Sequence, residues 1–471
     1  MKNEEQWMLS KVFELIEQHM PSGGKRTDRP VVRFLPPDGL KDEIDLSLPV
    51  DGVSGDDLIR DIEAYLHYSV ETADRQFANQ LYGGFNFPAF IGEMVTALTN
   101  TSMYTYEVAP VATLIETALL RKLNKLVGFE TGEGTFLTGG SNANLIAMFS
   151  ARNKMCPEIK TKGACGCSKL TAFVSEQCHY SFDTAANLLG IGSDQVYKIP
   201  VDPNGCMQVE ALDAAILQSG RAGETPFFIG ATAGTTLLGA FDPIEAIVAV
   251  GEKHRVWVHV DGAFGGPVIL SETHRKLLKG IDRADSFTMD PHKLMNVPLV
   301  CSVLLVKEKG RLMRNLTDLD TQYLYHDNDT ECHDLGKSSI QCGRRVDALK
   351  LWLAWRYFGD SGYSGRMDKQ MALARYAESK VEGRPELELL ARPQSVAVCF
   401  RYRNKNSKDI DEFNLQLRER MRKTGKSLIN YGYWNGNLAL RYVAINPDSE
   451  TEDVDVLFDH ILGIAQELEE E

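Results

Sequence analysis

The run VWVHVD at residues 256–261 is the clearest indication of the fold of this chain. Its length and its β-branched residues are typical of a strand that is buried on both faces of a sheet. A helical pattern near Pro243–His254 comes directly before it, and similar apolar runs lie at Thr171–Val174, Phe227–Ala231 and Leu299–Val306. Short buried strands that alternate with helices indicate an α/β domain built on a mostly parallel sheet.

The two ends of the chain differ in character from this central region. Residues Met1–Met20 predict an amphipathic helix, and an irregular connector follows at Leu35–Gly55. Near the other end, an alternating strand at Val396–Tyr402, a helix near Asp411–Arg422 and a second strand at Leu438–Ile445 indicate a separate α+β domain. We therefore predict an N-terminal helical segment at residues 1–80, a large domain at 81–350 and a small C-terminal α+β domain at 351–471.

Composition limits the classes of protein that fit. The chain has 471 residues, of which 43% are hydrophobic and 25% are charged, as expected for a globular protein with one large domain and smaller appendages. A net charge of -14 argues against nucleic acid and anionic membranes as partners, and no segment has the apolar length of a membrane span. We expect a cytoplasmic protein in which any anionic substrate meets local positive groups.

The cysteine pattern indicates a reducing compartment. Nine cysteines in 471 residues are too few and too scattered for a disulfide framework. The pair in Cys165-Gly166-Cys167 has a spacing that reaches a metal ion, but no second pair of cysteines or histidines lies near it in the sequence. We therefore predict no metal site.

A lysine follows the central strand, within the run Asp290-Pro291-His292-Lys293. A lysine that lies among cationic or desolvating groups is held neutral and attacks aldehydes. A carboxylate that ends a buried strand, such as Asp261, keeps a pyridine nitrogen protonated, so that the ring accepts electrons from a breaking bond. Either residue alone is ordinary, as a surface lysine after a turn or as a strand-end aspartate. Together, Lys293 and Asp261 indicate a site for pyridoxal 5'-phosphate.

Further motifs carry a family resemblance that runs from about residue 60 to the C-terminus. They include Ala231-Thr232-Ala233-Gly234-Thr235-Thr236, Val260-Asp261-Gly262-Ala263-Phe264-Gly265-Gly266, Pro291-His292-Lys293 and Gln341-Cys342-Gly343-Arg344-Arg345-Val346-Asp347. In these motifs the chain resembles the group II pyridoxal-phosphate decarboxylases, in the branch of the glutamate, cysteine sulfinate and aspartate decarboxylases. The resemblance implies the aspartate-aminotransferase type of fold (fold type I). It also implies α-decarboxylation of an acidic amino acid to the amine and CO₂.

The resemblance assigns residues to the cofactor site. A glycine pair before a helix, Gly139-Gly140, suits a phosphate, and the resemblance places Ser141, Asn142 and Ala143 there. His179 matches the histidine that stacks on the cofactor ring, although a lone histidine after a strand is more often a buried structural residue. The other cofactor-binding residues implied are Thr232, Asp261, Ala263 and Lys293, with Ser286 and His292 as phosphate ligands, and Cys342 and Gly343 reaching the phosphate of a neighbouring subunit. A homodimer with shared active sites follows from the same comparison.

Two departures from the family pattern bear on the chemistry. Relatives commonly read Asn-Pro-His-Lys where this chain has Asp290. A carboxylate that points inward here raises the basicity of Lys293, and a solvated one does not; of these alternatives we expect a structural role in the turn. Relatives also carry, on a mobile loop, a tyrosine that protonates the substrate, and no tyrosine lies between residues 325 and 341 of this chain. Either His333 or His326 then supplies the proton. If neither does, oxidative deamination or transamination on the same cofactor is the alternative function.

A third class of function is a noncatalytic regulatory protein with this fold. It is disfavoured because every cofactor position is filled by a residue with suitable chemistry.

The substrate residues support an enzyme as well. Arg441 lies on the apolar face of an alternating strand, where a charge needs a partner.

The resemblance implies that Arg441 binds a substrate carboxylate in a bidentate pair, whereas an exposed edge strand is the structural alternative. Gln80 and Tyr82 match a segment that enters the substrate pocket. Tyr82 shortens that pocket, which favours aspartate or cysteine sulfinate over glutamate. One methylene is worth about 1–3 kcal/mol of discrimination.

Overall fold

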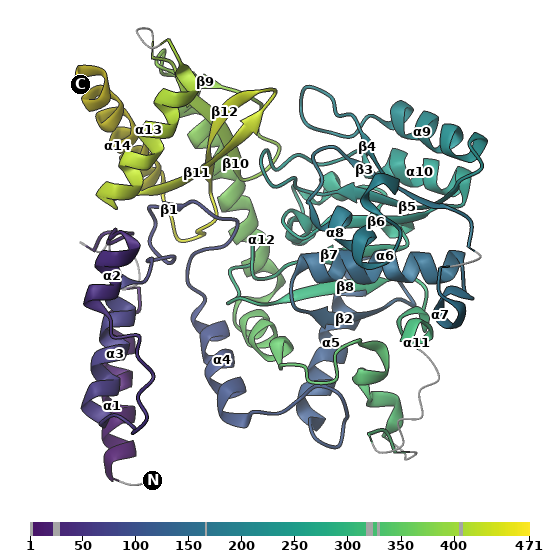
Figure 1. The fold of residues 1–471 in the computed structure, drawn as a ribbon, viewed down its shortest axis with the longest axis horizontal. Helices are drawn as coiled ribbons and strands as arrows, with labels where there is room; N and C mark the ends of the chain where they lie inside the picture. The colour runs from purple at the N-terminus through teal and green to yellow at the C-terminus, as the bar shows by residue number, and fades with distance from the viewer. Residues whose placement is uncertain (1–2, 22–28, 165–166, 317–323, 327–329, 405–407) are drawn as a thin grey trace. The chain divides into compact units, whose positions relative to one another are not determined.

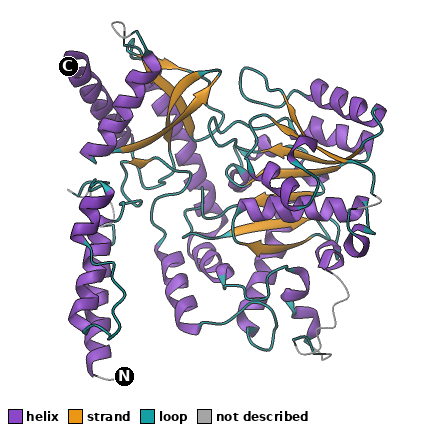
Figure 2. Ribbon diagram, viewed as in Figure 1, coloured by secondary structure: helices purple, strands orange, loops and turns teal. Residues whose placement is uncertain are grey.

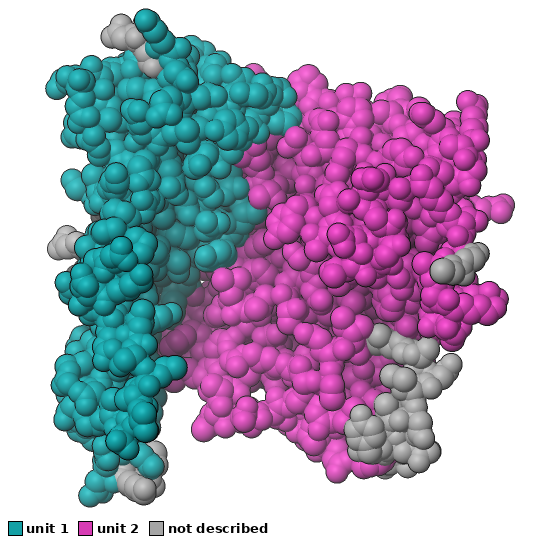
Figure 3. All heavy atoms as spheres, viewed as in Figure 1, with its two compact units in different colours: residues 1–85, 375–390, 398–471 teal, residues 86–374, 391–397 magenta. Residues whose placement is uncertain are grey.

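The computed structural model describes residues 3–21, 29–164, 167–316, 324–326, 330–404 and 408–471 (Figure 1). The chain divides into two compact units (Figure 3). The large unit consists of Asn86–Ala374 and Ala391–Ala397, and the small unit consists of Met1–Phe85, Arg375–Leu390 and Val398–Glu471. This division differs from the predicted boundaries at residues 80 and 350, because the N-terminal segment belongs to the same unit as most of the C-terminal residues.

A seven-stranded sheet forms the core of the large unit, in the order β2-β8-β7-β6-β5-β3-β4 (Figure 1, Figure 2). Its strands are β2 (Glu133–Leu137), β3 (Leu170–Ser175), β4 (Val196–Ile199), β5 (Thr225–Thr232), β6 (Trp257–Gly262), β7 (Ser286–Met289) and β8 (Ser302–Val306). The strand pairs between β4 and β7 are parallel, and β8 runs antiparallel to both of its neighbours. The four strands predicted from apolar runs are all in this sheet, and the predicted mostly parallel α/β fold is confirmed.

Helices surround these strands in the sequence, and α5, α6, α8, α9 and α10 pack on the sheet. The helices are α4 (Phe87–Thr99), α5 (Pro110–Val127), α6 (Gly140–Met155), α7 (Ile159–Lys162), α8 (Ser181–Leu188), α9 (Val209–Arg221), α10 (Ile244–His254), α11 (Arg311–Leu316) and α12 (Asp347–Glu382), of which α12 belongs to the large unit only as far as Ala374. Short 3-10 helices lie at Ser193–Gln195, Gly266–Leu270, Arg275–Leu278, Ile281–Arg283, Glu331–His333 and Leu335–Ser338. The helix α6 packs against β5, β6, β7 and β8, and its Ala147 and Met148 are fully buried there. Its N-terminus is thereby fixed relative to the ends of these strands.

A five-stranded sheet organises the small unit, in the order β1-β11-β12-β10-β9. Its strands are β1 (Phe77–Ala78), β9 (Leu387–Leu389), β10 (Ala397–Tyr402), β11 (Leu428–Trp434) and β12 (Asn437–Val443), and its helices are α1 (Asn3–His19), α2 (Pro37–Glu43), α3 (Gly55–Tyr68), α13 (Ile410–Thr424) and α14 (Thr451–Glu470). Phe77 and Ala78 pair in parallel with Leu428 and Ile429, so the N-terminal segment adds a strand to the C-terminal sheet. The connector predicted at Leu35–Gly55 contains the short helix α2.

The cysteines correct one expectation from the sequence. Cys156 and Cys167 form a disulfide, with Cα atoms 6.4 Å apart, where we expected cysteines in the reduced state. The chain turns through α7 between them, which brings two cysteines 11 positions apart into bonding range. Cys165 and Gly166, which were considered for a metal site, lie outside the described residues. Within the described residues, every helix falls short of the length and apolar content that crossing a membrane requires.

Candidate active site

The carboxyl ends of the parallel strands meet at one edge of the large unit's sheet, and the predicted catalytic residues lie along this edge. The strand β5 ends at Thr232, and Asp261 is the penultimate residue of β6. Asp290 follows β7 directly, Lys293 follows three residues later, and His179 follows β3. In open α/β sheets, this edge is where ligands bind.

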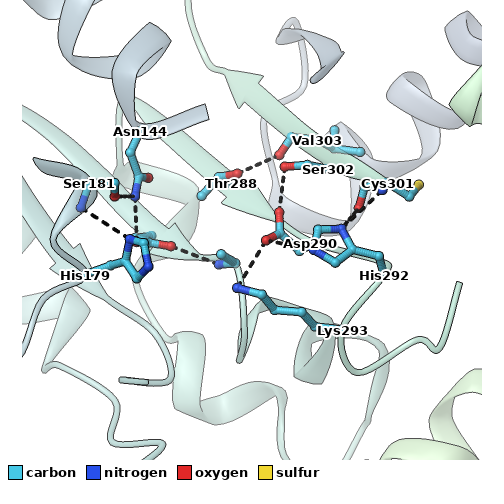
Figure 4. Close-up of polar contacts among 12 residues, drawn as sticks. Asn144, His179, Ser181, Thr288, Asp290, His292, Lys293, Cys301, Ser302 and Val303 are labelled. Atoms are coloured by element: carbon cyan, nitrogen blue, oxygen red, sulfur yellow. Dashed lines mark hydrogen bonds and ion pairs between the residues drawn. The ribbon is translucent and has the colours of Figure 1, made fainter. Parts of the chain in front are cut away.

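Lys293 and Asp290 point toward each other at this edge (Figure 4). The Nζ atom of Lys293 lies 3.2 Å from Oδ2 of Asp290, whose side chain is 1% exposed. Ser302, at the start of β8, donates a hydrogen bond of 2.5 Å to Oδ1 of the same carboxylate. The expectation of a purely structural turn role for Asp290 is therefore wrong. A turn does form, since Lys293 N donates to Asp290 O at 2.9 Å, but the side chain points inward because Ser302 offers it a buried donor.

Asp261 is held by one donor on each carboxylate oxygen. Asn144 Nδ2 donates to Oδ2 at 2.8 Å, and the backbone N–H of Ala263 donates to Oδ1 at 3.0 Å. Asp261 is 5% exposed. Asn144 was not predicted as a site residue from the sequence. The available signal was a polar residue on the side of α6 that also carries the buried Ala147 and Met148.

His179 is oriented by the first turn of α8. The backbone N–H of Ser181 donates to His179 Nδ1 at 3.3 Å, and Ser181 Oγ accepts a hydrogen bond of 2.9 Å from Asn144 (Figure 4). Burial lowers the pKa of His179, so its imidazole is neutral at neutral pH. Because Nδ1 accepts a hydrogen bond, the single ring proton lies on Nε2.

The first turn of α6 lies against the same edge. The first residue of the helix is Gly140, and an added Cβ there would meet Asp290 Oδ2 and Ala263 Cβ, each at 2.9 Å. Glycine at this position lets the helix N-terminus approach the strand ends closely. Two polar atoms nearby, Thr232 Oγ1 and Asn142 Oδ1, are buried and have no hydrogen-bond partner within the described part of the chain. Buried polar atoms without protein partners point to a bound ligand or water.

The structure gives the two predicted phosphate ligands Ser286 and His292 partners within the protein. Ser286 is fully buried, and its Oγ lies 2.9 Å from both Trp257 Nε1 and His259 Nδ1. His292 Nδ1 lies 2.7 Å from Cys301 O, and burial lowers the pKa of this imidazole. Their assignment to the phosphate stays a prediction.

In the small unit, Arg441 contacts the backbone of the segment that carries Gln80 and Tyr82. Arg441 is 5% exposed, and its Nη2 donates to Asn79 O at 3.0 Å, next to Gln80 in the chain. The strand β12, which carries Arg441, lies between β11 and β10, so the edge-strand alternative is wrong. Tyr82 packs near Phe77, with ring centroids 6.3 Å apart.

The segment before α12 is anchored by a buried ion pair. Arg344 Nη1 lies 2.7 and 2.8 Å from the two carboxylate oxygens of Glu116 on α5. The preceding residues Cys342 and Gly343 are exposed.

The ring of His333 lies 5.4 Å from that of Tyr106. The proposed tasks of Cys342, Gly343 and His333 stay predictions.

A buried carboxylate supports the end of β5. Asp242 Oδ2 accepts a hydrogen bond of 2.7 Å from Thr232 N, and Oδ1 accepts one of 2.7 Å from Met207 N. Burial raises the pKa of Asp242 to about 7. This residue therefore titrates near neutral pH while it holds the backbone of Thr232.

The sheet, the lysine with its paired carboxylate and the helix N-terminus define a fold type I pyridoxal-phosphate enzyme. The chain matches the pyridoxal-dependent decarboxylase conserved domain over residues 37–403, and it belongs to this family. The mouse protein named acidic amino acid decarboxylase GADL1 is 38% identical over 451 residues, which cover 93% of this chain and 82% of the relative. Rat cysteine sulfinic acid decarboxylase is 38% identical over 475 residues, which cover 98% of this chain and 96% of the relative.

Solved structures agree with this family. The structure of mouse CSAD in apo form has a TM-score of 0.94 and 38% identity, and the match covers 98% of both chains. The structure of Oryza sativa TDC with PLP and tryptamine has a TM-score of 0.90 and 26% identity, and the match covers 99% of both chains. The protein is a pyridoxal-phosphate-dependent amino-acid decarboxylase.

Proposed function

We propose that this protein removes the α-carboxylate of a small acidic amino acid, with aspartate or cysteine sulfinate preferred to glutamate, and releases the amine and CO₂. The observation that carries the proposal is the buried guanidinium of Arg441, bound to the carbonyl of Asn79 beside Gln80 and Tyr82. A buried cation in the substrate-binding segment of an amino-acid decarboxylase suits an acidic side chain. The relatives named for acidic amino acids and for cysteine sulfinic acid support this choice.

The residues at the sheet edge fit pyridoxal 5'-phosphate. Thr232 Oγ1 and Asn142 Oδ1 are buried polar atoms whose hydrogen bonds a ligand would complete. The first turn of α6, with Ser141, Asn142 and Ala143, would hold the phosphate, and Asp261 would hold the pyridine nitrogen. When bound, the cofactor supplies an aldehyde and an electron-accepting ring that takes up the electron pair of the breaking Cα–carboxylate bond.

Lys293 would bind the aldehyde carbon, for which its amine has to lose a proton. Asp290 is an acceptor for that proton, because its Oδ2 lies 3.2 Å from Lys293 Nζ. The hydrogen bond from Ser302 keeps the carboxylate in place. Asp290 therefore both positions the amine at the sheet edge and takes part in its deprotonation.

His179 presents a neutral ring with its proton on Nε2. The backbone of Ser181 fixes the opposite nitrogen, so the ring cannot present both nitrogens as donors. A neutral N–H donor orients a substrate carboxylate without forming an ion pair that would hold it back from leaving as CO₂. We assign this orienting role to His179.

Arg441 and Tyr82 would select the substrate. The bond to be broken has to stand perpendicular to the cofactor ring, and a grip on the side-chain acid sets that orientation. A guanidinium presents two parallel N–H donors to a carboxylate or sulfinate. Tyr82 fills the space that the extra methylene of glutamate needs.

The remaining assignments concern the loop and the assembly. His333 would return a proton to Cα after CO₂ has left, in place of the tyrosine that relatives carry on this loop. Cys342 and Gly343 would contact the phosphate in the partner subunit of a homodimer. Sedimentation that shows a fully active monomer would remove the second assignment.

The test is a comparison of specificity constants for three acids. For the native protein, kcat/KM for aspartate or cysteine sulfinate should exceed that for glutamate by about 10- to 200-fold, which is the range for one methylene in a pocket. Tyr82→Ala should reduce this ratio, whereas Tyr433→Ala, a matched change at an exposed tyrosine of β11, should not. A clear preference of the native protein for glutamate would contradict the proposal.

A further inference from the structure

A continuous chain of hydrogen bonds runs behind Asp261 through the interior of the large unit. Trp257 Nε1 donates to Ser286 Oγ at 2.9 Å, and Ser286 Oγ lies 2.9 Å from His259 Nδ1. His259 Nε2 lies 2.9 Å from Asn144 Oδ1, and Asn144 Nδ2 donates to Asp261 Oδ2 at 2.8 Å. None of these five residues is more than 5% exposed. These hydrogen bonds thus link Trp257, the first residue of β6, to Asp261, the predicted partner of the pyridine nitrogen.

The direction of every hydrogen bond in this chain is determined by its two ends. The indole N–H of Trp257 is only a donor, so Ser286 Oγ accepts from it and gives its own proton to His259 Nδ1. At the other end, the amide of Asn144 has to present its NH₂ group to the Asp261 carboxylate, which leaves Oδ1 as an acceptor for His259. His259 therefore carries its single proton on Nε2.

The protonation state of His259 agrees with this assignment. Burial lowers the pKa of His259 to about 3, so the imidazole stays neutral at neutral pH. The ring is fully buried and packs on Phe228, with ring centroids 5.9 Å apart. Every donor in the chain is thus a neutral group, and none of them cancels the charge of Asp261.

We propose that Asn144, His259 and Ser286 are positioning residues, which fix the orientation of the Asp261 carboxylate for the pyridine nitrogen of the cofactor. The proposal rests on the proposed role of Asp261 in cofactor binding. With Asn144 on Oδ2 and the Ala263 N–H on Oδ1, the carboxylate plane is set before the cofactor arrives. The free lone pairs of both oxygens then remain for a protonated ring nitrogen. Ser286 takes part through the imidazole, which gives this buried hydroxyl a task other than phosphate binding.

The test measures pyridoxal phosphate binding rather than turnover. The apoprotein is titrated with pyridoxal phosphate, and the dissociation constant and the visible circular dichroism of the bound cofactor are recorded. His259→Phe keeps the ring volume but removes both nitrogens, and we expect it to weaken binding by about 10- to 100-fold, as for outer partners of metal ligands. Ser286→Ala removes one oxygen atom instead of an imidazole, so it should weaken binding by a smaller factor and shift the dichroism in the same direction.

A matched control and a rescue separate positioning from stability. Thr288 lies on β7, directly opposite Asp261 on β6, and its buried hydroxyl donates to Val303 O. Thr288→Val therefore removes a hydroxyl close to Asp261 that takes no part in the hydrogen-bond chain from Trp257 to Asp261. It should leave the dissociation constant and the dichroism as in the native protein. His259→Gln places an amide N–H near the position of Nε2, so it should recover part of the affinity lost in His259→Phe.

Asp261→Asn provides the reference for this series. We expect Asp261→Asn to weaken the binding of pyridoxal phosphate more than His259→Phe or Ser286→Ala does. If Asp261→Asn binds the cofactor like the native protein, the proposed role of Asp261 is wrong, and the positioning chain is overturned with it. If Asp261→Asn is impaired while His259→Phe and Ser286→Ala behave like Thr288→Val, only the positioning chain is overturned.

Discussion

The buried ion pair between Arg344 and Glu116 should be a main support of the segment that precedes α12. The two carboxylate oxygens of Glu116 lie 2.7 and 2.8 Å from Arg344 Nη1, and the two side chains are only 1% and 4% exposed. Glu116→Gln leaves the guanidinium buried without a counter-ion, which costs about 3–5 kcal/mol. Such a loss is a large part of the about 5–15 kcal/mol that stabilises a typical folded protein.

The same pair predicts a non-additive double variant. Arg344 also donates to the backbone carbonyls of Phe136 and Met103, both at 3.3 Å. Arg344→Met therefore leaves two carbonyls as well as the Glu116 carboxylate without this partner. Adding Glu116→Leu removes the uncompensated charge, so the double variant should be more stable than Arg344→Met alone, with a coupling of about 0.5–3 kcal/mol.

Urea unfolding of the cofactor-loaded protein, followed by tryptophan fluorescence, measures these effects. Arg345→Met is the matched control, because the neighbouring Arg345 is 52% exposed and pairs with Glu93 at the surface, where an ion pair is worth at most about 1 kcal/mol. A loss below about 1 kcal/mol in Glu116→Gln, or additive single changes, would show that the Arg344–Glu116 pair is not a main support of this segment.

Three further predictions follow from the site. Asp290→Asn removes the carboxylate that positions Lys293 and accepts its proton, so the visible absorption band of pyridoxal phosphate should develop on the apoprotein more slowly by about 100-fold or more. An unchanged rate would count against this role of Asp290. Arg441→Met should lower kcat/KM for aspartate by about 100- to 1000-fold, whereas Arg401→Met, which breaks a pair with Glu388, should change it by less than about twofold. Burial raises the pKa of Asp242 to about 7, from about 3.9 in the unfolded chain, so its stabilising contribution is complete below about pH 4 and is lost as the pH rises through about 7. The urea midpoint of Asp242→Asn should consequently depend less on pH across this window than that of the native protein, and parallel profiles would contradict the assignment.

The parts of the fold that could be predicted are those encoded by local patterns. Runs such as Val256–Asp261 are long, apolar and β-branched, and they became buried strands because no other arrangement removes so much apolar surface from water. The two-residue strand β1 gave no such signal. It forms only because Leu428 and Ile429, far along the chain, offer it a partner.

In the site too, some residues could be predicted from local patterns, and others are brought together only by packing. Lys293 and Asp261 could be assigned because their chemistry is specific and each follows a recognisable strand. The inward turn of Asp290 could not, because it depends on Ser302, which arrives from a neighbouring strand. His259 shared a strand face with Asp261 by simple alternation, but its partner Asn144 lies on α6, and their contact is a product of packing.

The most direct test of the central claim is the product balance of the cofactor-loaded protein with aspartate, cysteine sulfinate and glutamate in separate reactions. Released CO₂, the amine and hydrogen peroxide are followed together, with Lys293→Met as the inactive control. We expect CO₂ and amine in equal amounts, without peroxide, and faster release from the two shorter acids. Aldehyde together with peroxide, or CO₂ release that persists in Lys293→Met, would contradict the claim.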